Sequence, residues 1–381
     1  MKGTILKVSY FLRDNGGCAY YRTFLPLETM AIKNGTIVNS FERGDKADKI
    51  ARALDADVFV LPRVCETDFI NLIPQFREGG CRIVIDHDDN MFEVSPFSPH
   101  YDEVGTEEIW VSVHGKRMPM WVSDLNKDQY KHLQIKPNYI DIERNKKRKD
   151  NFIIAMQEAD LVTVTQPILA DVYRPWSKKI VVLPNCVDMT LWKRLPFLPR
   201  ENIRLYWSGG SSHYEDWCMI AEVIPAIMKK YPNVTLVLFG TKFDGTLKQV
   251  PKERIEFHDW LATPAYPYKS AILDPDICVI PLYENEFSKC KSPIKWIEMG
   301  ALGVPCVTSH YSPYKELATE ANGIFIEKND KNAWIEGLSM LIEDKELRLK
   351  IGQEANNTVA KHYDINKEWI QWYNAYEELL K

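Results

Sequence analysis

The sequence contains neither a disulfide framework nor a zinc-binding pattern. Its eight cysteines are scattered over 381 residues, with no C-x-x-C pair and no histidine cluster at metal-ligand spacing. No apolar stretch approaches the ~20 residues that a membrane-spanning helix needs, and the first residues do not resemble a signal peptide. These absences predict a cytoplasmic protein without a structural metal.

Two familiar nucleotide-binding signatures are also missing. Gly16 and Gly17 are not part of a G-x-G-x-x-G fingerprint, which disfavours a Rossmann dehydrogenase, and no G-x-x-x-x-G-K-[ST] run occurs. The net charge of −5 disfavours a protein that attracts nucleic acid over its whole surface. A local basic groove remains compatible with that charge.

What the sequence does contain is a repeated alternation of short apolar runs, rich in β-branched residues, with helix-like segments. Continuous apolar runs are typical of strands covered on both faces, as in parallel sheets. Because the chain is longer than one hydrophobic core usually serves, the pattern predicts an α/β protein with two Rossmann-like parallel-sheet domains that face each other across a cleft. The expected strands are 5–12, 57–63, 82–88, 160–165, 179–185, 203–209, 234–240, 255–260, 277–282, 305–309 and 323–327.

The alternation pauses over 190–202, which has two prolines and no periodicity and is therefore predicted to be an interdomain linker. We expect a first domain over 1–195 and a second over 196–364. The first domain is expected to contain an irregular insertion at about 90–150, which ends in a charged helix with a KKRK run. The amphipathic segment 365–381 is expected to form a helix that packs back on the first domain.

In open parallel sheets, ligands bind beyond the carboxyl ends of the strands. The first expected strand is followed by a Gly-Gly loop, in which Gly17 permits close approach to a ligand, as well as by Tyr21 and Arg22. Arg22 is placed to bind a phosphate or a carboxylate. The alternatives are a plain turn and a surface ion pair, and the sequence leaves both open.

A later strand ends in an acidic cluster of Asp86, His87, Asp88 and Asp89. Crowded carboxylates are costly unless they bind polar groups, share protons or hold a cation. The cluster therefore predicts acceptor binding or proton handling, while a helix cap with solvated turn acids and a D-x-D metal site stay open.

The second domain opens with a strand followed by small residues. Ser208, Gly209 and Gly210 expose backbone N–H groups, so this loop is a candidate anion cradle. His213, which follows it, is a candidate donor to a phosphate or a sugar. An ordinary histidine at a helix start is the alternative.

The most specific pattern is KSPIKWIEMGALGVPCVTS at 291–309. Lys291, Lys295 and Glu298 have the spacing i, i+4 and i+7, which predicts that two cations and a carboxylate share one helix face. Ser292 lies near the start of that helix. Lysines beside a helix N-terminus suit a diphosphate, and a carboxylate two turns further on suits a ribose diol. A salt-bridged surface helix is the alternative.

The order of these motifs resembles the GT-B glycosyltransferases of the glycosyl transferases group 1 type, also called family four, which are mostly retaining enzymes. The resemblance rests on the Gly-Gly loop, LPNCVD at 183–188, FGT at 239–241, FHDW at 257–260 and the 291–309 motif. It covers nearly the whole chain and is specific over about 180–330. CAYYR, DDNMFE and SGGSSH resemble a branch found in bacteria and bacteriophages.

The resemblance implies that Glu298 matches the second glutamate of an E-x7-E motif and binds the donor ribose. Cys290 stands where the first glutamate belongs, so Glu286 and Lys291 are candidate substitutes for its contact with the donor sugar. It also implies that the backbone of Asp259 and Trp260 holds the base of the nucleotide. The usual Arg and Lys that clamp the diphosphate are replaced by the SGGSSH loop.

The predicted reaction is transfer of a sugar from a nucleotide sugar, by family resemblance a UDP-sugar, to an acceptor hydroxyl with retention. Asp88, Asp89, His87 and Lys291 are the predicted catalytic residues, and no cofactor or metal is required, although a divalent metal is not excluded. The acceptor stays open among polysaccharide, protein, small glycan and hydroxymethylated DNA. A nucleotide-sugar 2-epimerase and a non-catalytic nucleotide-sugar-binding protein are the competing hypotheses. In full, the predicted donor contacts are Gly17, Ser208, Gly209, Gly210, His213, Asp259, Trp260, Lys291, Ser292, Lys295 and Glu298, and the predicted acceptor contacts are Tyr21, Arg22, Asp86 and Asp88.

Overall fold

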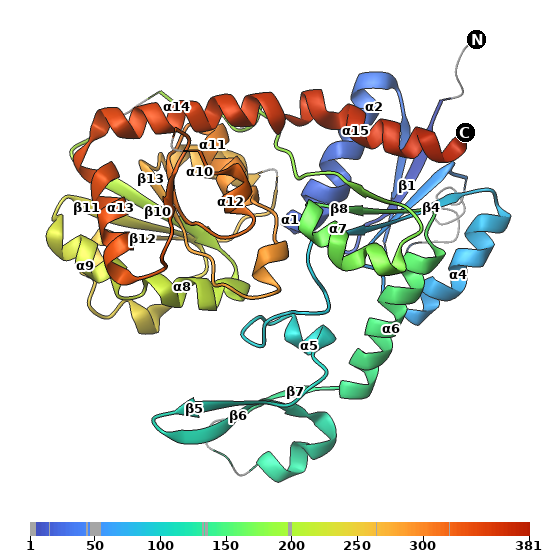
Figure 1. Cartoon of the computed structure of the whole chain (residues 1–381), viewed down its shortest axis with the longest axis horizontal. Helices are drawn as coiled ribbons and strands as arrows, with labels where there is room; N and C mark the ends of the chain where they lie inside the picture. The colour runs from blue at the N-terminus through green and yellow to red at the C-terminus, as the bar shows by residue number, and fades with distance from the viewer. Residues whose placement is uncertain are drawn as a thin grey trace.

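The computed structural model describes most of the chain and places it in two parallel-sheet domains with a projecting arm (Figure 1). Within this described part, no helix is long and apolar enough to cross a membrane. The linker prediction falls partly on residues 197–199, which lie outside the described residues. The described residues are 5–14, 16–42, 45, 55–131, 133, 136–196, 200–263, 265–319 and 321–381.

The first domain is built on a six-stranded sheet of order β2-β1-β3-β4-β8-β9, in which all neighbouring strands are parallel. Its central strands are buried along their whole length, which explains their continuous apolar runs. The strands are β1 (Lys7–Phe11), β2 (Ile37–Phe41), β3 (Val58–Pro62), β4 (Arg82–His87), β8 (Leu161–Val164) and β9 (Ile180–Val182). The helices are α1 (Gly17–Ala19), the π-helical turn η1 (Tyr20–Phe24), α2 (Leu25–Asn34), α4 (Thr67–Glu78), α5 (Tyr101–Val104), α6 (Ile142–Glu158) and α7 (Pro167–Tyr173).

The second domain repeats this plan with a parallel sheet of order β12-β11-β10-β13-β14-β15. The predicted fold class of two Rossmann-like domains is confirmed. The strands are β10 (Ile203–Gly209), β11 (Val234–Gly240), β12 (Ile255–Asp259), β13 (Ile277–Ile280), β14 (Cys306–Ser309) and β15 (Ile324–Ile326). The helices are α8 (Tyr214–Ile220), α9 (Val223–Lys230), α10 (Ala265–Ile272), α11 (Ile294–Ala301), α12 (Tyr314–Leu317), α13 (Lys331–Glu343) and α14 (Lys345–His362), and the last helix of the chain, α15 (Ile365–Glu377), follows them.

The chain crosses between the domains twice, and the two crossings touch. The N–H of Val187 donates to Tyr363 O at 2.9 Å, and the N–H of Ile365 donates to Val187 O at 2.9 Å. Beyond this bridge, α15 leaves the second domain and packs against α2 of the first, as Figure 1 shows at its top edge. Trp372 and Tyr376 of α15 are buried in the core there. The domain boundaries given by the sequence stay a prediction.

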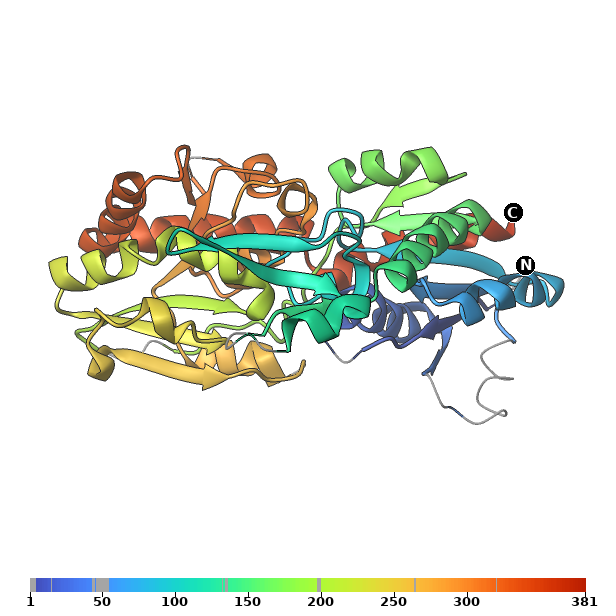
Figure 2. The ribbon, with the colours of Figure 1, turned by 90° about the horizontal axis from the view of Figure 1, so that it is seen from below.

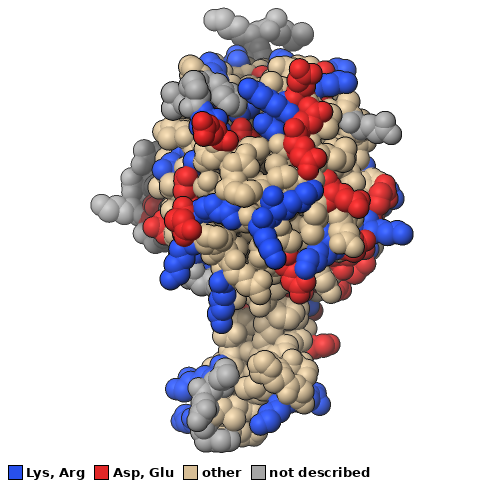
Figure 3. Space-filling view, turned by 90° about the vertical axis from the view of Figure 1, so that its left-hand side faces the viewer, with Lys and Arg blue, Asp and Glu red and all other residues tan. Residues whose placement is uncertain are grey.

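A three-stranded sheet forms an arm between α5 and α6. It consists of β5 (Ile109–Val113), β6 (Lys116–Ser123) and β7 (Asn138–Ile140), with the 3-10 turn η2 (Asp124–Tyr130). From below, the arm runs along the long axis of the molecule, from the junction between the domains across the front of the second domain (Figure 2). Lysine and arginine side chains lie on both sides of its end (Figure 3).

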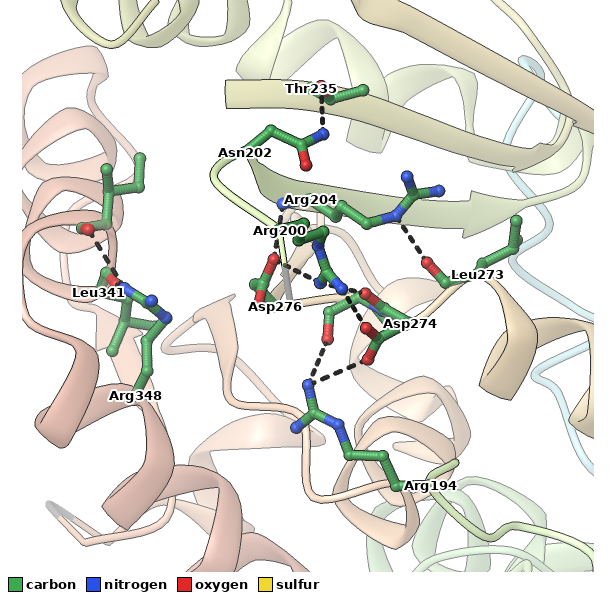
Figure 4. Close-up of polar contacts among 12 residues, drawn as sticks. Arg194, Arg200, Asn202, Arg204, Thr235, Leu273, Asp274, Asp276, Leu341 and Arg348 are labelled. Carbon is green, nitrogen blue, oxygen red and sulfur yellow. Dashed lines mark hydrogen bonds and ion pairs between the residues drawn. The ribbon is translucent and has the colours of Figure 1, made fainter. Parts of the chain in front are cut away.

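The predicted linker is fixed to the second domain by arginines at either side of 197–199 (Figure 4). Nη2 of Arg200 donates to Asp276 Oδ2 at 2.7 Å, and Arg200 also binds the carboxylate of Asp274. Arg194 donates to Asp274 Oδ1 at 3.4 Å and to the carbonyl oxygen of Pro275 at 3.2 Å. Arg194, Arg200 and Asp276 line a cavity of about 230 Å³ at the amino ends of the strands, opposite to the ligand-binding end of the sheet. Their bonds keep the linker on this domain.

We expect the substitution Asp276→Asn to lower the free energy of unfolding by about 1–3 kcal/mol, because buried Asp276 accepts both from Arg200 and from the N–H of Arg204. Urea unfolding measures the loss. Glu253→Gln, at an exposed position of the same domain, is the control. An equal loss in both variants would contradict the role given to this network.

Candidate functional site

A cleft of about 450 Å³ lies between the carboxyl ends of the two sheets. Hydrogen bonds close it across the domains: Tyr21 Oη donates to Glu298 Oε1 at 2.7 Å, and Asn185 Nδ2 donates to Ser292 Oγ at 2.9 Å. Gly17, at the start of the helical segment that contains Tyr21, lines the same cleft. Both domains therefore contribute to one site.

The three residues that the sequence singled out all line this cleft. Their predicted local structure is wrong in one respect: α11 begins only at Ile294, and Lys291 lies in extended backbone before it. Pro293 at the N-cap position begins the helix, so only Lys295 and Glu298 lie on it. The side chains of Lys291, Lys295 and Glu298 nevertheless meet in the same cavity.

The cleft perturbs the ionisation of these groups. Burial lowers the pKa of Lys295 to about 8, helped by the charge of Lys291. Its ammonium lies 5.5 Å from the ring centroid of Trp207, a cation–π distance. Burial also raises the pKa of Glu298 to about 7, although the hydroxyls of Tyr21 and Tyr266 donate to its carboxylate. An anion that enters the cleft relieves the repulsion between the lysines.

This arrangement predicts a pH dependence of anion binding. Lys295 is charged below its pKa of about 8 in the empty cleft, and a bound diphosphate raises that pKa. The contribution of Lys295 to the affinity for UDP should therefore be constant well below pH 8 and should fall by at most about tenfold per pH unit above it. Calorimetry from pH 6.5 to 9.5 measures the slope. In Lys295→Met, whose side chain does not titrate, the part of the slope due to Lys295 should vanish; an unchanged slope would contradict this assignment.

The small-residue loop after β10 also borders the cleft. Ser208, Gly209, Gly210 and His213 line it. A Cβ on Gly209 would lie 2.9 Å from Trp207 Cζ2 and 3.1 Å from His213 Cδ2, so the glycine lets both rings pack closely. A Cβ on Gly210 would meet no atom within 4 Å.

Gly210 thus offers a test of close ligand approach. Its backbone is extended, at φ −84° and ψ −179°, and alanine adopts this conformation without strain. We expect Gly210→Ala to leave the melting temperature unchanged and to weaken nucleotide-sugar binding about tenfold, because its methyl group occupies cleft space. The two melting curves, with and without ligand, measure both effects. Unchanged ligand binding would show that the ligand stays away from this loop.

Two of the four residues in the acidic cluster line the cleft. Nε and Nη2 of Arg63 donate to the two oxygens of Asp88 at 2.5 and 2.7 Å. Burial opposes ionisation of Asp88, but the Arg63 guanidinium outweighs it and holds the pKa of Asp88 well below its ordinary value. Burial and the charge of Asp88 raise the pKa of Asp89. Asp89 is therefore the better proton acceptor, while Asp88 is a fixed carboxylate.

The other two residues of the cluster do not reach the cleft, contrary to their predicted roles. Asp86 is 2% exposed and accepts from Nη2 of Arg22 at 2.7 Å and from Thr163 at 2.6 Å. Arg22 is equally buried and also bonds Leu183 O, so this pair belongs to the core rather than to an acceptor site. His87 is fully buried, and burial lowers its pKa to about 3. It cannot orient a hydroxyl in the cleft.

Of the other predicted site residues, some line the cleft and others do not. Trp260 lines the cleft and is 57% exposed, whereas the exposed Asp259 does not line it. Cys290 is 0% exposed within the core of the first domain, with Asn90 Nδ2 3.9 Å from its sulfur. Glu286 pairs with Lys289 outside the cleft. Of the two candidate contacts for the donor sugar, Glu286 and Lys291, only Lys291 lines the cleft.

Arg63, His100, Asp216 and Tyr266 also line the cleft, although they were not predicted site residues. A signal existed for Arg63, which is the last residue of a predicted strand, and for Asp216, three residues after His213. Tyr266 had none. Among the described residues, no three His, Cys, Asp or Glu side chains are grouped to hold a metal ion, and independence from metal stays a prediction.

Comparison with known proteins assigns the second domain. Residues 203–344 match the family model described as glycosyl transferases group 1. This part of the chain is similar to glycosyl transferases group 1 domains. An uncharacterized glycosyltransferase of Haemophilus influenzae is 25% identical over 180 residues, which are 45% of this chain and 48% of that protein. The chain therefore spans about half the length of this relative.

Solved structures extend the likeness to both domains. Sucrose-phosphate synthase from Thermosynechococcus elongatus has a TM-score of 0.66 at 15% identity and covers 98% of this chain and 99% of its own. Anabaena HepE, solved with UDP and glucose, has a TM-score of 0.61 at 12% identity and covers 97% and 99%. The fold is GT-B, as the sequence predicted. These relatives are bacterial, and the likeness to a bacteriophage branch stays a prediction.

Proposed function

We propose that this chain transfers a sugar from a nucleotide sugar, with a UDP-sugar as donor, to an acceptor hydroxyl with retention. The observation that carries the proposal is the convergence of Lys291, Lys295 and Glu298 in the interdomain cleft of a chain whose second domain is of the glycosyl transferases group 1 type. UDP is favoured because the similar HepE binds it.

The chemistry follows from the charges in the cleft. The bond between the sugar C1 and the diphosphate oxygen breaks with its electron pair on oxygen, and Lys291 and Lys295 stabilise the charge that develops there. The acceptor oxygen then bonds to C1 on the same face. Its proton passes to a phosphate oxygen or to Asp89, whose raised pKa suits it to accept one.

Thermal shift with a panel of nucleotide sugars tests donor binding, because a ligand that binds the folded state raises the melting temperature by mass action. Release of UDP in the presence of acceptor then tests transfer. An epimerase would instead produce an altered nucleotide sugar without acceptor, and a binding protein would give a thermal shift without any product. No shift with any nucleotide sugar would overturn the proposal.

The acceptor stays open among polysaccharide, protein, small glycan and hydroxymethylated DNA. The DNA hypothesis drew on the KKRK run, which lies on α6. Lys146 pairs with Glu143 at 2.8 Å, and Lys149 donates to Phe92 O at 3.1 Å. Most of this run is thus held by its own domain.

We propose that the acceptor enters beside His100, near the base of the arm, and the same four acceptor classes form the assay panel.

A further inference from the structure

A histidine–carboxylate pair, His213 and Asp216, lines the cleft, and the proposed mechanism does not use it. His213 Nδ1 is 2.6 Å from Asp216 Oδ2, and the other oxygen of Asp216 accepts from the N–H of Tyr283 at 2.8 Å. Asp216 is 5% exposed, and although burial opposes its ionisation, its contact with His213 lowers its pKa. An ionised carboxylate only accepts, so Nδ1 of His213 carries a proton.

The other ring nitrogen of His213 faces the ligand space. His213 lines the cleft, and its Cδ2 edge, next to Nε2, lies against Gly209. No bond from Nε2 to another described residue occurs. With Nδ1 bonded to Asp216, Nε2 is the atom that a bound molecule meets.

Three charged groups act on this imidazole. Asp216, in the first turn of α8, favours the imidazolium, while Lys291 and Lys295, on the turn before α11 and on α11, oppose it. Burial and the two lysines lower the pKa of His213 to about 4. In the empty cleft the ring is therefore neutral, and its bare Nε2 cannot donate to a phosphate oxygen.

We propose that His213 takes up a proton from solvent when the diphosphate of a nucleotide sugar binds, so that its Nε2–H becomes a third cationic donor to the phosphates. This inference rests on the proposed function. The negative charge of the diphosphate compensates the lysines that keep the empty ring neutral. Asp216 then holds the imidazolium from behind, as a buried carboxylate does in a catalytic triad.

The protons and charges balance over a catalytic cycle. One proton enters from solvent on binding and stays on Nε2 while the sugar–oxygen bond breaks, hydrogen-bonded to the oxygen that gains the electron pair. It returns to solvent when the nucleotide leaves. The pair thus supplies the positive charge that an arginine provides permanently, but only while the cleft is occupied.

The experiment is calorimetric titration of the whole chain with UDP-glucose at pH 6.0, in two buffers of different ionisation enthalpy. The diphosphate of UDP-glucose does not titrate near this pH, and Lys295 is already charged there. We expect wild-type protein to take up as much as about one more proton per bound molecule than His213→Gln. We also expect the variant to bind about tenfold or more weakly.

Asp216→Asn provides a second variant, since it removes the carboxylate that stabilises the imidazolium; it should reduce proton uptake as well. Melting curves without ligand check that both variants are folded. Equal proton uptake by wild type and folded His213→Gln would overturn the inference and leave the proposed function standing. If UDP-glucose and the rest of the nucleotide-sugar panel give no binding at all, the proposed function fails and this inference fails with it.

Discussion

Replacing Lys295 by methionine is expected to lower the transfer rate by about 100- to 1,000-fold, the usual effect of deleting one donor to a developing oxyanion. The lysine is half-buried in the cleft, and its ammonium lies over Trp207 beside Lys291. Methionine keeps most of the packing volume and removes the charge. Single-turnover release of UDP measures the loss, and donor affinity is expected to fall as well.

Lys289→Met is the matched control, because Lys289 lies on the turn that precedes α11, pairs with Glu286 and does not line the cleft. It should retain the wild-type rate. A wild-type rate for Lys295→Met, or equal losses of rate in both variants, would contradict the role of Lys295 in stabilising the departing diphosphate.

The second large effect is expected from Glu298→Gln. Its carboxylate accepts from Tyr21 at 2.7 Å and from Tyr266 at 3.2 Å, which leaves lone pairs for a ribose diol. Loss of charge-assisted hydrogen bonds costs about 1.5–3 kcal/mol, so the KM for the nucleotide sugar should rise about 10- to 100-fold. kcat should fall less, because the ribose is remote from the breaking bond.

Glu286→Gln is the control for this substitution. Glu286 is a second glutamate of the same segment, once a candidate for the missing first position of E-x7-E, but it pairs with Lys289 outside the cleft. We expect an unchanged KM. If Glu298→Gln raises KM no more than Glu286→Gln does, ribose binding by Glu298 is ruled out.

Sequence patterns predicted the second domain better than the first. The six strands of its sheet coincide with predicted apolar runs. The signal is continuous for the four inner strands β10, β11, β13 and β14, which are buried along most of their length. Edge strand β2 and the arm strands β5 and β6 are only partly buried, so their sequences lack that signal. Lys295 and Glu298 were found because helical spacing and a preceding apolar strand combine in one segment.

The site predictions that were wrong concern residues whose contacts are remote in the sequence. Asp86 and His87 look like parts of one exposed acidic turn, but β4 continues through His87. Successive strand residues point to opposite faces, and both faces of this sheet are covered. Asp86 therefore meets Arg22, and His87 packs against Phe152 and Tyr173. No local pattern distinguishes such a core ion pair from a ligand site.

The crossing of α15 onto α2 has a consequence for biosynthesis. The first domain is made first, yet a layer of its core comes from Trp372 and Tyr376, which are translated nearly two hundred residues later than β9. On the ribosome, the apolar surface of α2 that these side chains cover stays exposed while the whole second domain is synthesised. Nascent chains stalled before Ile365 should therefore bind chaperones through this surface, and release should coincide with the arrival of α15.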